Sequence, residues 1–535
     1  MTKAMAATLV LCFCVLATVA SGAEAAANSI SSCLLSNGVR NFSLPASPSF
    51  AALVRSSIRN LRFALPSVGK PAAIVLPNSK KDLQAAIRCA RSSSLAIRAR
   101  SGGHSYEGLS YTTENHVPFA VIDLMNLRRV RVDSRSGTAW VEAGATLGEL
   151  YLALGKYSNL SSSSSSLAFS SGSCSTVGVG GIISGGGFGL ISRKFALAAD
   201  NVLDAVLVGP NGDAFTRESM GEDVFWAIRG GGGGSWGAVY AWKLQLVHVP
   251  RNITVFSLGR TGPVQHIAKL MHKWQYVGPY LPDEFYVSVF IPTGTSSNGN
   301  LSMSFTGQAL VPKQHAMSTL NQTFPELALD ESDLSEVSWV ESTAKFAGLD
   351  TVNDLANRRF EQGSYSKSKS DYVRSPISMR DVVEIIRYLS NGPQQGSIQL
   401  DPYGGAMARL DSGAIPFPHR AGNLYSIQYG VSWQPSDNDR ADEYIGWLRS
   451  FYAFMGSYVS KDPRAAYVNY LDLDLGTNDW TNATDGARNG SVIHARSWGE
   501  SYFSKNFDRL VRAKTKIDPG NVFNNAQSIP PLPQH

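Results

Sequence analysis

The spacing of apolar residues changes several times along the chain, and each change marks an expected element. Residues 71–79 contain a short apolar run that predicts a strand. Apolar residues recur at helical spacing beyond Ser79, at Leu83, Ala86, Ile87 and Ala90. A serine before such a pattern is typical of a helix N-cap, so the sequence predicts a strand followed by a capped helix.

Further along, short apolar runs predict strands separated by turns. Residues 94–103 and 119–127 are β-like, and residues 129–144 alternate between apolar and polar positions on both sides of a Ser-Gly turn. This alternation predicts a β-hairpin. Residues 145–157 show helical spacing, and the serine-rich residues 160–167 that follow are predicted to form a surface loop.

A change in the residue pattern after Pro250 predicts a second domain. From about residue 251 to residue 465, mixed strands and amphipathic helices replace the glycine-rich loops of the first part, and residues 264–274 are one such helix. The last part has a helix that ends at Asp-Pro-Gly and an extended segment, which we expect to dock onto the first domain. The predicted division is residues 28–250, with a core from about residue 70, then 251–465 and 466–535.

Two segments of the later part place polar residues on one face of an expected strand. Residues 423–433 predict an aromatic-rich strand on which Ser426 and Gln428 share a face. The opposite face carries Tyr425, Ile427 and Tyr429. Residues 467–476 are likewise predicted to expose one face with Tyr470, Asp472 and Asp474. These residues are either half-buried sheet positions or part of a site.

Composition limits the function classes. The chain has 535 residues, 43% of them apolar, which is enough for two globular domains with their own cores. The formal net charge is +6, but Lys and Arg are scattered and form no run. We therefore expect no nucleic-acid partner.

The first residues have the three parts of a secretory signal. Lys3 precedes an apolar run from about Met5 to Ala20, and small residues follow as far as Ala27. We expect residues 1–25 to be removed and the mature protein to be exported without a membrane span. The chain also carries seven Asn-x-Ser/Thr glycosylation sequons, at Asn41, Asn159, Asn252, Asn300, Asn321, Asn482 and Asn489.

Cysteine usage is consistent with export. Cys12 and Cys14 lie in the expected signal, so the mature chain keeps three cysteines. In an oxidising compartment, we expect a disulfide between Cys33 and Cys89, worth about 4 kcal/mol in the chain-entropy model. Cys174 is then left as an odd thiol. It is either a buried inert cysteine or a residue kept for chemistry, and its glycine-rich surroundings favour chemistry.

Glycines cluster in three places, which predicts loops that meet around one large ligand. Gly102 and Gly103 precede His104, seven glycines fall within residues 178–189, and five consecutive glycines follow Arg229. This density is too high for a stable helix or strand interior. Backbone N–H groups in such turns form anion-binding nests that suit a pyrophosphate. The alternative is that these loops are merely flexible.

Several motif matches in this region do not hold. Residues 232–237 match GxGxxG and residues 233–237 match GxSxG, but the strand-like residues 238–249 follow. A dinucleotide fingerprint or a nucleophile elbow needs a helix at that point, so we reject both, including Ser235 as a hydrolase nucleophile. No P-loop, HExxH or CxxC motif occurs, and we expect no metal site.

The motifs in combination resemble one family. They are RxRSGGHxYEGLSY, GSCxTVGVGGxxxGGGFG, FWAIRGGGG, FPHRAGNLYxIQY, NYxDLDLG and DPxNxFxxxQSIPPL, and the match as a whole runs from about Cys33 to Leu532. In this order they are similar to plant berberine-bridge-enzyme-like FAD oxidoreductases, which include grass pollen group 4 allergens. The resemblance implies an α+β chain with a two-domain, PCMH-type FAD-binding fold. The antiparallel sheet of its α/β substrate domain would cover the flavin.

The resemblance also implies a bicovalent flavin. In the family, a histidine binds the flavin 8α carbon and a cysteine binds C6, and these roles fall to His104 and Cys174. The resemblance thereby gives the unpaired thiol of Cys174 a role in flavin attachment. The other expected FAD-binding residues are Arg100, Ser101, Gly102, Gly103, Ser105, Val177, Gly178, Gly180 and Gly181.

One position suggests the electron acceptor. In similar proteins, the residue three after the cysteine controls oxygen access, with valine leaving room and leucine or isoleucine closing it. Val177 stands there, so the resemblance implies an oxidase that releases hydrogen peroxide. The alternative is that Val177 is simply a packing residue.

Positions at which this chain departs from the family pattern narrow the range of candidate substrates. Berberine-forming members have a glutamate base where this chain has Gln428, and an amide cannot take a proton. Monolignol-oxidising members have lysine where Ser426 stands and tyrosine where Phe188 stands. Many members have histidine at Ile182, a change that would alter flavin potential, and proline at Ser175, a change expected to be structural.

The remaining candidate base is a tyrosine, Tyr106 or Tyr470, with Gln428 positioning the substrate. We therefore predict a secreted, monomeric FAD-dependent oxidase of the cell wall or apoplast. Its small-molecule or oligosaccharide substrate would carry the reacting hydroxyl on a carbohydrate or phenolic alcohol, with molecular oxygen as acceptor. The alternatives are a monolignol-type dehydrogenase or oxidase, and a weakly active flavoprotein kept for binding or defence.

Overall fold

The computed structural model describes residues 25–56, 58–114, 117–160, 165–358, 363–478 and 488–533. Nearly all of the expected signal, residues 1–24, lies outside these ranges. The predicted loop at residues 160–167 lies partly outside them, and the strand β7 (Ser165–Ala168) already begins within the serine run. Within the described ranges, no helix has the length and apolar character needed to cross a membrane.

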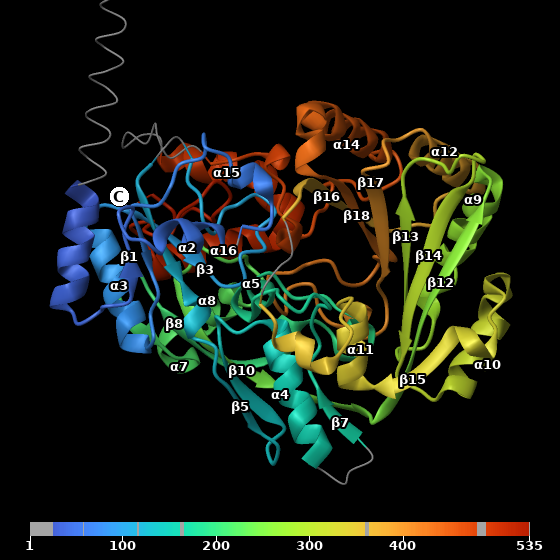
Figure 1. Cartoon of the computed structure of the whole chain (residues 1–535), viewed down its shortest axis with the longest axis horizontal. Coiled ribbons are helices and arrows are strands. Elements are labelled where there is room, and N and C mark those ends of the chain that lie inside the picture. Colours follow the sequence, from blue (N-terminus) through green and yellow to red (C-terminus); the bar gives the residue numbers. More distant parts are fainter. Residues whose placement is uncertain are drawn as a thin grey trace, which may run out of the picture.

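The first part of the chain builds two main sheets (Figure 1). One has the order β1-β2-β4-β3, with β2, β4 and β3 parallel, and the other has the antiparallel order β5-β6-β10-β8-β9. β7 pairs separately with β11. The strands are β1 (Phe42–Ser43), β2 (Ala73–Val75), β3 (Ala96–Arg100), β4 (Phe119–Asp123), β5 (Val130–Asp133), β6 (Thr138–Glu142), β8 (Val202–Val208), β9 (Ala214–Phe215), β10 (Ala238–Gln245) and β11 (Val247–Pro250).

The local predictions for this part are largely confirmed. The Ser79 hydroxyl accepts a hydrogen bond from the Asp82 N–H and caps α3, and β5 and β6 form the predicted hairpin. The glycine-rich loop after Arg229 leads into the strand β10 and not into a helix. The matches to a dinucleotide-binding fingerprint and to a nucleophile elbow are therefore excluded. The helices are α2 (Phe50–Arg55), α3 (Lys80–Ser92), α4 (Leu147–Leu160), α5 (Val179–Ser184), α6 (Ser192–Phe195), α7 (Arg217–Met220) and α8 (Glu222–Ile228).

The helix α5 corrects one prediction, because it lies inside the segment judged too rich in glycine for a helix. The helix is only six residues long. A side chain at Gly180 would come within 2.7 Å of the Ala143 carbonyl oxygen. Glycine therefore serves close packing of this short helix on the chain after β6.

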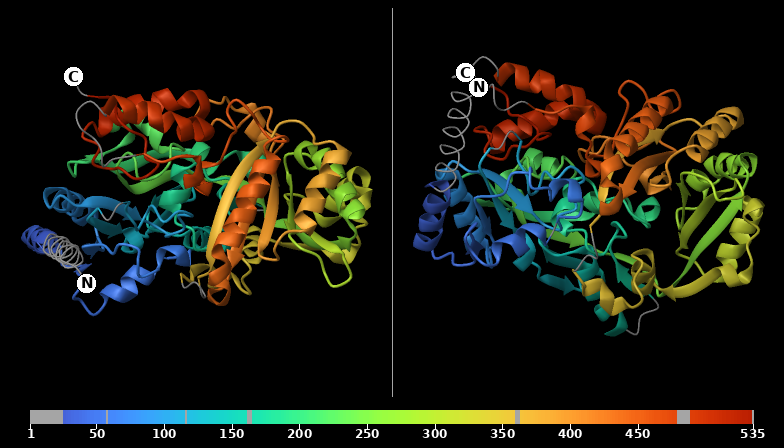
Figure 2. Two further views of the ribbon diagram at one scale, coloured as in Figure 1. Left: turned by 90° about the horizontal axis from the view of Figure 1, so that it is seen from above. Right: turned by 45° about the horizontal axis from the view of Figure 1, so that its top comes forward.

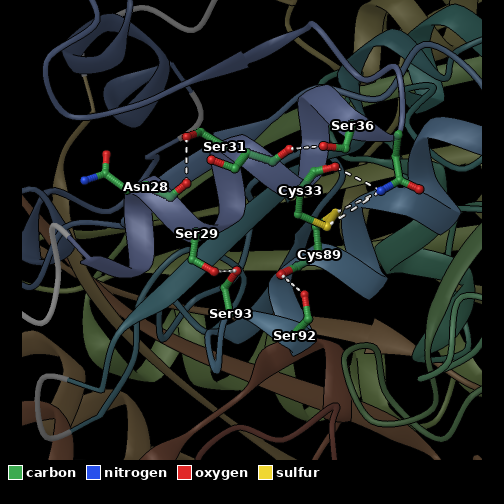
Figure 3. The surroundings of a disulfide bond; sticks show 10 residues. Asn28, Ser29, Ser31, Cys33, Ser36, Cys89, Ser92 and Ser93 are labelled. Atoms are coloured by element: carbon green, nitrogen blue, oxygen red, sulfur yellow. Dashed lines mark hydrogen bonds between the residues drawn. A yellow bond between two sulfur atoms is a disulfide. The ribbon is translucent and has the colours of Figure 1, made fainter.

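The Cys33–Cys89 disulfide forms as predicted, with a Cα–Cα distance of 5.6 Å. It ties the helical residues 25–36 to α3 (Figure 3). Cys174 is left as a free, exposed cysteine, so the alternative of a buried inert thiol is wrong.

The second part is a seven-stranded antiparallel sheet of order β15-β12-β14-β13-β17-β18-β16 (Figures 1 and 2). Apolar residues on one face form a core with α9, α12 and α14. The strands are β12 (Asn252–Gly262), β13 (Phe285–Pro292), β14 (Leu301–Ala309), β15 (Leu334–Ser338), β16 (Tyr365–Val373), β17 (Gly396–Pro402) and β18 (Tyr425–Trp433). The helices are α9 (Val264–Gln275), α10 (Lys313–Thr323), α11 (Trp339–Phe346), α12 (Met379–Ser390), α13 (Ala406–Arg409) and α14 (Ala441–Met455).

The strand β18 has the predicted alternation, since Tyr425, Ile427 and Tyr429 join the helix-covered core. The strand predicted for residues 467–476 does not form. The chain instead makes two 3₁₀ turns, Val468–Tyr470 and Leu473–Leu475, so Tyr470 is not on the sheet.

The C-terminal segment returns to the first part of the chain. The helices α15 (Arg488–Phe503) and α16 (Phe507–Ile517) lie beside the N-terminal sheets in both views of Figure 2. Leu510 and Val511 of α16 share a core with Phe225 and Trp226 of α8.

Candidate functional site

The three glycine-rich loops converge on one cavity of about 470 Å³. Residues 101–106 line it from the first loop, residues 177–178 and 180–182 from the second, and residues 231–237 from the third. The sheet adds Tyr286, Gln399 and Asp401, and the segment after α14 adds residues 467–471. The predicted convergence on a single site is therefore present.

The glycines in this cavity serve two purposes. A Cβ atom at Gly102 would overlap the Gly178 backbone nitrogen, and one at Gly178 would overlap the Ser101 side chain. These two glycines therefore let the first and second loops touch. A Cβ atom at Gly181 would have nothing within 4 Å, so Gly181 faces open space in the cavity.

This difference predicts opposite outcomes for two alanine substitutions. Gly102→Ala should lower the free energy of unfolding by about 1–3 kcal/mol, because two backbones have to separate. Gly181→Ala should leave stability unchanged or slightly higher, because alanine favours the helix α5. Its new methyl group should instead reduce flavin content, measured as flavin absorbance per protein. Equal thermal stability of the two variants would contradict this reading.

His104 and Cys174 are brought together by one threonine. The His104 Nε2 atom lies 2.9 Å from the Thr176 hydroxyl, and the Cys174 Sγ atom lies 3.7 Å from the same oxygen. Burial is the main cause that lowers the pKa of His104, to about 3. The imidazole is therefore neutral at physiological pH, the state in which it can act as a nucleophile.

Tyr106, Tyr470 and Gln428 form a group in the same part of the site. The Tyr106 and Tyr470 rings stack with 5.5 Å between centroids and an interplanar angle of 3°. The Gln428 side-chain amide donates a 2.7 Å hydrogen bond to the Tyr106 hydroxyl, although Gln428 itself does not line the cavity. Burial raises the pKa of Tyr106 to about 12 and that of Tyr470 well above its usual value.

A buried cluster of charges supports this stack. Lys367 of β16 is an ion-pair partner of Glu107, which follows Tyr106, and of Asp472, which lies two residues after Tyr470. The Lys367–Asp472 distance is 2.7 Å, and all three side chains are at most 4% exposed. One ammonium group of the sheet therefore joins the two loops that carry the stacked tyrosines. Sequence reasoning had placed Asp472 on a strand face and missed this role.

Aromatic rings form another wall of the cavity. Phe188 stacks on Tyr403 at 5.0 Å and contacts Tyr286 at 6.3 Å between centroids. Ile182 also lines the cavity, whereas Ser175 does not. These positions agree with the expectation that a change at Ile182 affects the ligand and a change at Ser175 does not.

Asp401 is a cavity residue that sequence reasoning missed. Its side chain is 2% exposed and accepts hydrogen bonds from the Tyr286 hydroxyl and from the Gln399 amide. Burial raises the pKa of this carboxyl group, and the two hydrogen bonds oppose the rise. The only sequence signal was alternation along residues 396–402, where Asp401 precedes a proline and a Tyr-Gly-Gly turn.

Comparisons with known proteins agree with this geometry. Residues 71–217 match a family model described as an FAD binding domain, and residues 466–530 match one described as berberine and berberine like. A reticuline oxidase from Eschscholzia californica is 48% identical, over 94% of this chain and 92% of that protein. The chain belongs to the berberine bridge enzyme-like family of FAD-binding oxidoreductases.

Solved structures of the family give the same result. The berberine bridge enzyme from Eschscholzia californica superposes with a TM-score of 0.90 at 47% identity, covering 95% of this chain and all of that one. Phl p 4, a grass pollen allergen with glucose dehydrogenase activity, superposes with a TM-score of 0.86 at 38% identity, covering 94% and 100%. The predicted family and the α+β, PCMH-type fold are confirmed.

The cavity of this berberine bridge enzyme-like chain fits FAD. Gly181 leaves open space beside the second loop, and Cys174 is a free, exposed thiol at the same wall. The Ser110 hydroxyl in the lining is buried and has no hydrogen-bond partner among the described residues. A polar ligand would satisfy that group.

Arg100 departs from the predicted FAD-binding set. Its buried side chain forms a 2.6 Å ion pair with Asp123 and donates a 2.8 Å hydrogen bond to the Leu53 carbonyl oxygen. It does not line the cavity, whereas every other predicted FAD-binding residue does. Arg100 therefore stabilises the sheet beneath the first loop and is not among the residues proposed below to contact FAD.

The C-terminal segment completes the third glycine-rich loop of this family member. The buried Lys514 ammonium donates 2.6 Å and 2.7 Å hydrogen bonds to the Ser235 and Phe523 carbonyl oxygens and pairs with Asp518 at 2.7 Å. The Ser235 hydroxyl accepts a hydrogen bond from the Ile529 N–H. Ser235 is thus a structural residue, in line with the rejection of a nucleophile elbow.

Proposed function

We propose that the chain is a secreted oxidase that removes a hydride from a hydroxyl-bearing carbon of a carbohydrate or a phenolic alcohol, with oxygen as acceptor. One observation carries this proposal: the His104–Thr176–Cys174 group and the Tyr106–Tyr470 stack line the same cavity. Bound FAD would accept the hydride and, once reduced, would pass two electrons to oxygen to give hydrogen peroxide.

We propose His104 and Cys174 as two covalent attachment points for FAD. The neutral imidazole and the accessible thiol lie on either side of Thr176. The other residues proposed to hold FAD line the same cavity: Ser101, Gly102, Gly103, Ser105, Val177, Gly178, Gly180 and Gly181. Two attachment points hold a ring in one position relative to the substrate, which favours a fixed reaction geometry.

Tyr106 and Tyr470 are proposed as the groups that contact the substrate hydroxyl. Burial raises the pKa of both, so at neutral pH each phenol is protonated and acts as a hydrogen-bonding group. Gln428 would fix the orientation of Tyr106 through its 2.7 Å hydrogen bond. The same Gln428 argues against the alkaloid ring closure of berberine-forming relatives, since an amide is not a base.

The substrate class rests on two considerations. The cavity rings of Phe188 and Tyr286, with Tyr403 stacked behind Phe188, suit the apolar face of a sugar ring or a phenolic ring. The absence of a lysine at Ser426 separates this chain from monolignol-oxidising members and favours a carbohydrate. Phl p 4, which has glucose dehydrogenase activity, shows that a similar fold accommodates a sugar.

Export and domain division are proposed on the same footing. The disulfide, the signal-like N-terminus and the sequons support an extracellular monomer in the cell wall or apoplast. Asn252 and Asn321 are exposed, Asn41 and Asn300 are partly exposed, and the side chains of the other three sequon asparagines lie outside the described set. Residues 28–250 and 466–535 would form the FAD-binding domain and residues 251–465 the substrate domain.

An anaerobic reduction experiment tests the proposed reaction. Cellobiose and coniferyl alcohol are each mixed with the holoenzyme, and flavin bleaching is followed at about 450 nm, a wavelength typical of this cofactor class. We expect bleaching by at least one compound. No bleaching by either compound would contradict the proposed reaction.

A second stage of that experiment tests the acceptor. An oxygen pulse should restore the absorbance within seconds and release hydrogen peroxide. Val177→Leu should slow this reoxidation at least tenfold without changing the anaerobic step, because the larger side chain fills space over the flavin site. Equal reoxidation rates would make Val177 a packing residue only.

A further inference from the structure

Asp401 lies where the sheet faces the cavity. Its neighbours Ile398 and Leu400 on β17 belong to the helix-covered core, whereas Gln399 and Asp401 line the cavity. The side chain is almost completely buried. A carboxyl group removed from water in this way needs a partner or a function.

No cation compensates this carboxyl group among the described residues. Asp401 forms no ion pair there, whereas the buried Asp371 of β16, two strands away in the same sheet, pairs with Arg464 at 2.6 Å. The residue opposite Asp401 in the β17–β18 register is Ser426, and cross-strand partners share a face of the sheet. Serine at that position leaves Asp401 without the charge that a lysine would supply.

The hydrogen bonds to Asp401 use only one of its oxygens. Tyr286 of β13 and Gln399 both donate to Oδ1. No donor from the described residues reaches Oδ2, which leaves that oxygen for a ligand in the cavity. The two donors fix the orientation of the carboxylate.

The titratable groups that face Asp401 are all phenols. Tyr106 from the first loop, Tyr286 from β13, Tyr403 and Tyr470 each interact electrostatically with it. Burial raises the pKa of all four, so they are neutral at physiological pH. Asp401 is thus the group among them that can be ionised near neutral pH, and Gln428 cannot take a proton at all.

We propose that Asp401 is the catalytic base that accepts the proton of the substrate hydroxyl. The inference rests on the proposed hydroxyl oxidation and supplies its missing proton acceptor. The substrate O–H bond breaks and its proton moves to Oδ2, while the C–H electron pair leaves as hydride, which bound FAD would accept, and a carbonyl group forms. Reoxidation by oxygen then takes two electrons and two protons, one of which comes from Asp401.

The decisive variant is Asp401→Asn, which keeps the shape of the side chain and removes its basicity. With the compound among cellobiose and coniferyl alcohol that reduces the wild type faster, the variant should show anaerobic reduction slowed about 10²–10⁴-fold. The wild-type rate should rise with pH as Asp401 ionises. This rise is the acid limb of the pH–rate profile, and the variant should lack it. FAD content should be equal in both proteins.

The matched control is Asp371→Asn. It makes the same exchange in a buried carboxyl group of the same sheet, on the opposite face and away from the cavity. Burial raises the pKa of Asp371 to about 6, so it is the other group that could produce an acid limb. This variant should keep both the acid limb and the reduction rate, with reduced stability because Arg464 loses its charged partner.

Two further variants move the acid limb in opposite directions. Gln399→Leu removes a hydrogen bond that favours the carboxylate, so the limb should move to higher pH. Ser426→Lys places a cation on β18 directly opposite Asp401, so the acid limb should move to lower pH. A purely structural Asp401 would give no such pair of shifts.

A readout independent of catalysis comes from thermal unfolding. An acid with a raised folded-state pKa destabilises the protein once pH rises above its unfolded pKa of about 3.9. Relative to Asp401→Asn, the wild type should therefore lose melting temperature from about pH 4 upward, until pH passes the raised folded-state pKa. A constant difference across pH 4–8 would contradict the assignment of a titrating, unpaired carboxyl group.

The outcomes separate the two proposals. If cellobiose or coniferyl alcohol reduces the wild type and reduces Asp401→Asn at a similar rate, Asp401 is not the catalytic base. The proposed hydroxyl oxidation would still stand. If the variant changes only the substrate concentration for half-maximal reduction, Asp401 is a binding residue and the inference is likewise overturned. If neither compound reduces the wild type, hydroxyl oxidation itself fails and the base fails with it.

Discussion

Replacing both His104 and Cys174 by alanine is expected to abolish covalent flavin completely. In the proposed arrangement each residue alone would provide one bond to the flavin, because Thr176 lies beside both side chains. Each single variant should therefore keep the flavin on the denatured chain, and only the double variant should lose it. Flavin fluorescence of the protein band on a denaturing gel measures this directly.

The matched control for this experiment is Thr176→Val. It removes the hydroxyl that lies near both side chains and leaves the two attachment atoms in place. Attachment in this variant should be slower but should reach completion. If either single variant already releases all flavin, the bond to the other residue does not form and attachment is single.

A second large effect is expected from the buried charge cluster. Replacing Lys367 by methionine and Glu107 by glutamine removes one positive and one negative charge together, while Asp472 keeps its 2.6 Å ion pair with Lys369. The fold should survive, but Tyr106 and Tyr470 should lose the ammonium group that joins their loops. Displacement of such positioning groups by about 1 Å costs on the order of 10²-fold in rate.

The measurement for the Lys367 and Glu107 double variant separates kcat from KM. We expect kcat to fall about 10²-fold with little change in FAD content, because the attachment residues lie outside the cluster. Lys367→Met alone should instead destabilise the protein by about 3–5 kcal/mol, since Glu107 would stay buried and charged. Arg440→Ala, which removes an exposed ion pair with Glu443, is the neutral control. Unchanged kcat in the double variant would limit the cluster to a structural role.

Much of the architecture was predictable because local chemistry and tertiary structure agree. The Ser79 cap, the β5–β6 hairpin and the alternation of β18 follow from patterns that span only a few residues. The cysteine pairing also needed no structure, because only three cysteines follow the expected signal and few pairings are possible. The glycine clusters predicted loops that converge around one ligand, and one cavity lies between these loops.

The errors come from features that depend on distant neighbours. A period of two cannot distinguish a strand from two successive 3₁₀ turns, so Tyr470 was misplaced. Arg100 belongs to a flavin motif, but its partner Asp123 lies on the adjacent strand. Asp401 precedes a proline and looks like a turn residue, and only the register with Ser426 reveals that it is unpaired.

The Lys514 and Ile529 contacts to the third glycine-rich loop set a limit on the order of events during synthesis. A ribosome-bound chain that stops before Lys514 lacks the groups that bind the Ser235 carbonyl oxygen and hydroxyl. The loop at residues 231–237 then has no partner on that side, although His104 and Cys174 emerged hundreds of residues earlier. Cofactor capture in a fully formed cavity therefore comes late in synthesis.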